Sequence, residues 1–184
     1  VNPYCQLIVN TKLLKPNKDE LHFMREFVNS LSSQLSCSYD VVPPLSSYFP
    51  EKNLRELISL RNAISEVNVT SAKQVLLACW YFIIEACSNR KKDGNGLATR
   101  PSPVVNVVDY FKRTLEELIE DYSEHPFELD TLSAVYTSSA DMFASFSDQF
   151  SKLSGKQLGA IIFSPPYANA FDYYESYKME LLFG

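Results

Sequence analysis

Four consecutive residues, Ser164-Pro165-Pro166-Tyr167, carry the clearest chemical signal in the chain. They directly follow the apolar run at residues 160–163, which predicts a short buried strand. A hydroxyl, two proline carbonyls and an aromatic ring are therefore expected together at the carboxyl end of a strand, where open α/β sheets bind their ligands. Because proline has no N–H and a fixed φ, this backbone would present carbonyl oxygens rigidly and without competing donors.

This set of groups suits the activation of an exocyclic amine, a poor nucleophile because its lone pair is delocalised into the ring. The Ser164 hydroxyl and the Pro165 carbonyl can each accept a hydrogen bond from the amine. That grip favours a pyramidal nitrogen whose lone pair is free to attack a methylsulfonium. Tyr167 could stack on a base flipped out of a duplex, as enzymes that act on a base require. Since serine is a neutral acceptor and no general base, proton loss would follow methyl transfer.

The tetrapeptide, its preceding strand and the segment 168–173 together resemble motif IV of the S-adenosylmethionine-dependent amino-methyltransferases, which methylate cytosine or adenine in DNA. The SPPY form is most similar to the cytosine-N4 branch. The resemblance implies that Ser164, Pro165, Pro166 and Tyr167 form a catalytic loop. Asn169 and Asp172 are candidates for the pocket of the target base, because they lie close to Ser164 in the sequence. Outside this family, Pro-Pro-Tyr also occurs as a plain turn or as a ligand for aromatic-lined grooves.

The first residues of the chain are similar to the motif II segment of the same family. There, a strand ends in an acidic residue that binds the cofactor ribose, and an Asn-Pro turn then opens a helix. The resemblance places Asn2 and Pro3 beside S-adenosylmethionine, while the strand and its acid would precede Val1. None of the five glycines opens a helix after a buried strand, as the methionine-binding loop requires. We therefore expect an internal piece of a longer enzyme, inactive alone, with an intact small helical protein as the alternative.

A third family-like segment begins near residue 132. Residues 132–136 predict a strand, and residues 138–141 lie where motif III of the family would fall. In relatives an acidic residue there binds the adenine amine of the cofactor, which makes Asp141 the candidate. Asp141 is also suited to cap the helix that follows, so both roles stay open. The tyrosines at 173, 174 and 177 would either line the base pocket or pack a helix against the sheet.

Between these segments the apolar spacing predicts helices. Asn17 with Glu20 forms a capping-box pattern ahead of the first of them. Residues 41–48 are expected to be a loop, and Pro50 to open the second helix.

A third helix, to about residue 88, is apolar on nearly every face and is expected at the centre of the core, with Thr70 or Ser71 as its cap. Ser102-Pro103 is expected to open a fourth helix.

The connection 89–102 is the predicted nucleic-acid contact. It is expected to be a loop around Gly94-Asn95-Gly96, with four basic residues that could reach backbone phosphates: Arg90, Lys91, Lys92 and Arg100. The alternative is a solvated turn, since charge runs are usually only surface.

Composition restricts the remaining possibilities. A net charge of −5 argues against a strong nonspecific grip on phosphates by the chain as a whole. Four cysteines without Cys-x-x-Cys spacing and only two histidines predict no metal site and free thiols in a reducing cytoplasm. The absence of a Pro-Cys dipeptide, which cytosine-C5 methyltransferases use as nucleophile, supports transfer to nitrogen. The longest apolar run, residues 75–84, is too short to cross a membrane.

Together these features predict an α/β fold class: an incomplete Rossmann-like methyltransferase, dominated by a helical insertion and with few parallel strands. Residues 1–12 would form the motif II-like edge, 13–128 the insertion (a lid or target-recognition element), and 129–184 the segment with the SPPY loop. The expected activity is methylation of an exocyclic amino group of a flipped DNA base, with cytosine N4 as the preferred target, in an enzyme of the kind often linked to restriction. An RNA or protein-amide methyltransferase and a helical protein-interaction module are the alternatives.

Overall fold

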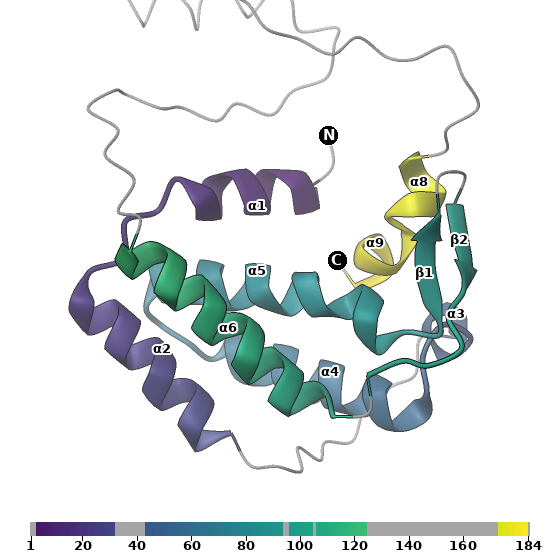
Figure 1. The fold of residues 1–184 in the computed structure, drawn as a ribbon, viewed down its shortest axis with the longest axis horizontal. Coiled ribbons are helices and arrows are strands. Elements are labelled where there is room, and N and C mark those ends of the chain that lie inside the picture. Colours follow the sequence, from purple (N-terminus) through teal and green to yellow (C-terminus); the bar gives the residue numbers. More distant parts are fainter. Residues whose placement is uncertain (1–2, 32–42, 94–95, 105, 125–172, 184) are drawn as a thin grey trace, which may run out of the picture.

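The computed structural model describes residues 3–31, 43–93, 96–104, 106–124 and 173–183. These residues are mostly helical, with one small antiparallel hairpin (Figure 1). The elements follow in the order α1 (Pro3–Lys12), α2 (Lys18–Ser30), α3 (Pro43–Ser46), α4 (Glu51–Ser65), α5 (Thr70–Cys87), β1 (Arg90–Asp93), β2 (Gly96–Thr99), α6 (Val107–Glu124), α8 (Tyr173–Ser176) and α9 (Lys178–Phe183). The described residues contain no parallel strands. The strands predicted at 132–136 and 160–163, and the Rossmann-like sheet they imply, lie outside these residues.

Helix α5 is the centre of the core, as its apolar sequence predicts. It contacts α1, α2, α4, α6, α9 and β1. Figure 1 shows it between α1 and α4, with α6 crossing it. Trp80 is fully buried, and its indole N–H donates to the Leu57 carbonyl of α4 at 2.9 Å. Phe82 departs from the prediction, because its side chain remains 39% exposed.

Helix α2 begins as the capping pattern predicts. The Asn17 side chain accepts a hydrogen bond from the Glu20 N–H at 2.9 Å, and the Glu20 carboxylate accepts one from the Asn17 N–H at 2.7 Å. These two bonds satisfy donors that a helix N-terminus otherwise leaves unpaired. The helix then buries its predicted apolar stripe, Leu21, Met24 and Val28.

The structure corrects the expected start of α6 and the expected cap of α5. The fourth helix, α6, begins at Val107 and not at Ser102-Pro103, since the Asn106 side chain accepts a hydrogen bond from the Asp109 N–H at 3.1 Å and caps the helix there. Neither Thr70 nor Ser71 caps α5, where Val69 holds the cap position without a side-chain bond. Pro50 is the residue just before α4.

The predicted loop at 41–48 is also corrected, because it contains the short helix α3. Its two prolines, Pro43 and Pro44, stand in the first turn, where a missing N–H breaks no helical hydrogen bond.

The predicted loop at 89–102 is a β-hairpin instead. Strands β1 and β2 pair antiparallel, with Arg90 opposite Thr99 and Asp93 opposite Gly96. Only two residues separate the strands, and Asp-Gly-Asn-Gly is typical of a tight hairpin connection. Gly96 has a φ of 151°, which L side chains rarely adopt. The basic residues of β1 do not indicate a strand, because lysine is depleted in strands.

Candidate functional site

Most of the predicted catalytic and cofactor residues lie outside the described part of the chain: Asn2, Asp141, Ser164, Pro165, Pro166, Tyr167, Asn169 and Asp172. Pro3 is described as the first residue of α1. All four basic residues of the predicted nucleic-acid contact are described, and the structure shows what each one touches. The described part of the candidate site is therefore the hairpin with the helices beside it.

Lys92 points toward the protein from β1. Its ammonium forms an ion pair with Glu180 of α9. The same nitrogen lies 4.5 Å from the centre of the Tyr177 ring and 5.9 Å from that of Tyr4, both within the range of a cation–π contact. The Glu180 side chain is only 2% exposed, whereas that of Lys92 is 31% exposed, so the carboxylate of this ion pair is buried and the lysine partly reaches water.

Arg90, two residues earlier on the same strand, also has partners within the protein. Its guanidinium lies 5.6 Å from the centre of the Tyr48 ring. One guanidinium nitrogen donates to the Thr99 hydroxyl across the hairpin at 3.1 Å. The Arg90 Nε is buried and has no hydrogen-bond partner among the described residues.

Glu85, in the last turn of α5, ties the hairpin to the central helix. Its Oε1 accepts a hydrogen bond from Arg100 at 3.3 Å and another from the Lys92 backbone N–H at 3.1 Å. Arg100 also donates from Nε to the Arg90 carbonyl at 3.2 Å. Phosphate contact by Arg90, Lys92 or Arg100 stays a prediction, and a phosphate would have to compete with these internal partners.

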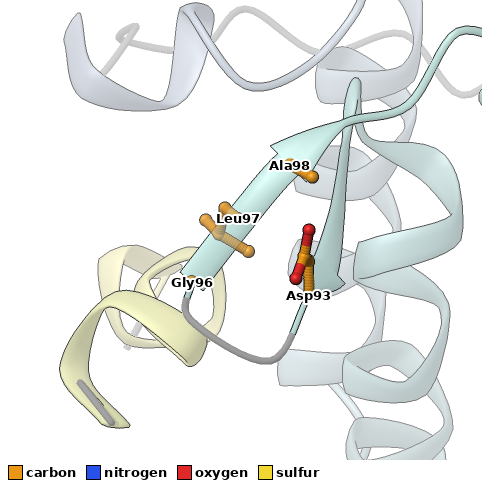
Figure 2. A pocket seen from close by; sticks show the side chains of 4 residues that line it. All are labelled: Asp93, Gly96, Leu97 and Ala98. Carbon is orange, nitrogen blue, oxygen red and sulfur yellow. The ribbon is translucent and has the colours of Figure 1, made fainter. Parts of the chain in front are cut away.

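Lys91 lies on the opposite face of β1 and is exposed. Within the described ranges its ammonium has neither a salt bridge nor a side-chain hydrogen bond. The end of the hairpin bears an open cavity of about 250 Å³, lined by Asp93, Gly96, Leu97 and Ala98. Figure 2 shows the Asp93 carboxylate at the end of β1 and Leu97 and Ala98 along β2, with the C-terminal helices beside the hairpin tip. Lys91 is thus the hairpin cation best placed for an external anion.

Tyrosines from three parts of the chain are in contact near the hairpin. The Tyr4 ring lies 5.2 Å from Tyr81 of α5 and 5.7 Å from Tyr177, centre to centre. Burial, and secondarily the negative charge of Glu180, raises the pKa of Tyr4 to about 12. Tyr177 therefore packs against the first turn of α1, and its expected roles, in the base pocket or in packing a helix against the sheet, stay predictions.

Three residues of this site were not identified from the sequence: Tyr4, Glu85 and Glu180. Tyr177 lies just before α9 and Glu180 lies in its first turn, three positions further along the sequence. Nothing local identifies Lys92 as the partner of Glu180, because it is 88 positions away.

The described residues show no sign of a metal centre or a membrane segment. Among them, no group of three or more His, Cys, Asp or Glu side chains could hold a metal ion. No helix in these ranges combines the length and apolar character needed to cross a membrane. Cys5, Cys79 and Cys87 are free thiols. Burial raises the pKa of Cys87 to about 12 and that of Cys79 further, so these two thiols are poor nucleophiles.

Comparison with known proteins gave no match: no family model, curated protein or solved structure is significantly similar to this chain. Its function must therefore be inferred from its own residues and geometry.

Proposed function

We propose that this chain is part of an S-adenosylmethionine-dependent DNA amino-methyltransferase that methylates the exocyclic nitrogen of a flipped base, with cytosine N4 as the preferred target. The observation that carries the proposal is the SPPY tetrapeptide at the end of a predicted strand. In this proposal Ser164 and Pro165 accept hydrogen bonds from the amine, and Tyr167 stacks on the base. Serine at position 164 favours a DNA base over the RNA and protein-amide targets of related Asn-Pro-Pro-Tyr loops.

The positions at which the predicted helical insertion begins and ends support this proposal. An insertion must leave and re-enter its host domain at neighbouring points. Near the predicted boundaries, the Tyr122 hydroxyl of α6 donates to the Thr11 carbonyl of α1 at 2.6 Å. Burial raises the pKa of Tyr122 to about 12, so this hydroxyl is protonated and able to donate. The geometry is therefore compatible with an insertion between residues 12 and 129.

The meeting of the two family-like ends is a second support. The motif II-like and motif IV-like segments would serve one active site, so the residues beside them must lie close together. Tyr4, in the first turn of α1, contacts Tyr177, which lies ten residues beyond Tyr167 in the sequence. Helices α1, α8 and α9 thus bring regions from opposite ends of the chain to one side of α5 (Figure 1).

The proposed methyl donor is S-adenosylmethionine, which supplies an electrophilic methyl group. Of the residues predicted to lie beside it, Pro3 is the one that the structure describes. As the first residue of α1, it precedes backbone N–H groups without a helical acceptor. Such groups could donate to ribose oxygens. The methionine-binding half of the enzyme would be supplied by sequence outside these 184 residues.

Methyl transfer to duplex DNA tests the proposal, measured with labelled S-adenosylmethionine and the natural enzyme that contains this chain. Replacing Ser164 with alanine removes one acceptor for the amine, so we expect kcat to fall about a hundredfold. Ser30→Ala is the matched control, because Ser30 is an exposed serine at the end of α2, outside the proposed site. Equal activity of wild type and Ser164→Ala would contradict the proposed role of the SPPY loop.

A further inference from the structure

Lys92 connects the hairpin to both ends of the chain. Its ammonium is held by the Glu180 carboxylate of α9 and lies over the rings of Tyr177 and Tyr4. These partners belong to the segment that follows the SPPY loop and to the first turn of α1. One side chain thereby links the helical middle to the two regions that flank the proposed active site.

The surroundings of Glu180 make this contact difficult to release. The carboxylate is 2% exposed, and its Oε2 has no hydrogen-bond partner among the described residues. Withdrawal of Lys92 would leave a buried charge unpaired, which is strongly unfavourable. The two tyrosine rings further favour a cation in this position. Lys92 is therefore poorly suited to leave its partners for a DNA phosphate.

The backbone of Lys92 is fixed as well. Its N–H donates to Glu85 of α5, which also accepts a hydrogen bond from Arg100. Lys92 is thus held to the central helix through its backbone and to α9 through its side chain. Its neighbour Lys91 projects from the other face of the same short strand and is exposed.

We infer that Lys92 is a positioning residue that fixes α8 and α9 against the hairpin and the opening of α1. The consequence for catalysis rests on the proposed function. DNA that binds through Lys91 would be held one residue away from Lys92, which positions the helices after the SPPY loop. The hairpin would then align the bound DNA with the catalytic segment, so that loss of Lys92 impairs the chemical step more than DNA binding.

Hydrogen exchange in the full chain tests the positioning role without a methyl donor. Lys92→Met keeps much of the aliphatic stem and removes the charge, so we expect amide exchange in α8 and α9 to accelerate about a hundredfold, equivalent to about 2.8 kcal/mol. Lys91→Met is the matched control and should leave exchange in these helices unchanged. Lys92→Arg should retain most of the protection, because arginine can also pair with Glu180 and lie over tyrosine.

A second variant separates positioning from general unfolding, since Lys92→Met alone leaves Glu180 buried and unpaired. The double variant Lys92→Met/Glu180→Gln removes both charges, and α2 serves as an internal reference for global stability. Fast exchange confined to α8, α9 and the first turn of α1 would support the inference. Wild-type exchange in these helices for the double variant would overturn it.

Methyl transfer by the natural enzyme then tests the catalytic consequence. The double variant should lower kcat about tenfold or more with an unchanged KM for DNA, whereas Lys91→Met should raise KM. A raised KM with unchanged kcat in the double variant would show that Lys92 contacts DNA directly and would overturn the inference. Absence of methyl transfer by the wild-type enzyme would overturn the proposed function alone, because the exchange result does not depend on that activity.

Discussion

Lys91 and Lys92 are adjacent, carry the same charge and lie on one strand, yet their surroundings differ. Lys91 is exposed, whereas Lys92 is held by Glu180 and two tyrosines. The difference arises from β1, because successive side chains of a strand point to opposite faces. A run of basic residues in a sequence can therefore contain both charges that are paired within the protein and charges that are exposed to a ligand. The local backbone decides to which group each residue belongs.

The largest expected difference between the two lysines is their contribution to stability. It is tested by neutralising each lysine in turn and measuring the free energy of unfolding in urea. Lys92→Met leaves the Glu180 carboxylate buried and unpaired, so we expect a loss of about 3 kcal/mol. Lys91→Met should change stability by less than about 0.5 kcal/mol, as surface substitutions usually do. Equal effects of the two substitutions would contradict the distinction between the two faces.

Glu85 provides a smaller perturbation of the inner face. Glu85→Gln removes the charge that accepts hydrogen bonds from Arg100 and from the Lys92 N–H, so we expect a loss of about 1.5 kcal/mol in unfolding free energy. Glu117→Gln on the exposed side of α6 is a control of the same chemical type. If both substitutions leave the midpoint of urea unfolding unchanged, the hairpin is not held to α5 through Glu85.

The outer face is tested by DNA binding of the natural enzyme at several salt concentrations. A phosphate contact through Lys91 predicts that Lys91→Met weakens binding by about 1 kcal/mol on any sequence and reduces the salt slope by about one. Lys92→Arg, which keeps the inner charge, should leave both quantities near their wild-type values. An unchanged salt slope for Lys91→Met would remove this lysine from the DNA contact.

The smallest expected effect is a pH dependence at the tyrosine contact. In the folded chain the pKa of Tyr4 is about 12, whereas an unfolded tyrosine titrates near 10. Its contribution to stability is therefore complete below pH 10 and is lost as the pH rises through 12. Because Tyr4 is only partly buried, we expect less than about 1 kcal/mol. Urea unfolding between pH 9 and pH 12 should show a shallower decline in Tyr4→Phe than in wild type. Identical slopes would exclude this contribution.

Local signals predicted the helices well. Helix α2 begins at the Asn17–Glu20 capping box, and α5 is central because it is apolar on nearly every face. The sequence predicts a loop where the structure has the hairpin, since basic residues occupy the positions that β-branched residues usually fill in strands. Contacts between residues that are distant in the sequence cannot be predicted from local patterns. The contacts of Lys92 with Glu180, and of Tyr122 with Thr11, join residues 88 and 111 positions apart.

The chemical identity of the methylated nucleoside tests the central claim most directly. DNA treated with the natural enzyme and S-adenosylmethionine would be digested to nucleosides and analysed by mass spectrometry against authentic standards. We predict N4-methyldeoxycytidine, formed by the wild type and strongly reduced in Ser164→Ala. Digests that contain 5-methyldeoxycytidine, or no methylated nucleoside, would contradict transfer to an amine held by the SPPY loop.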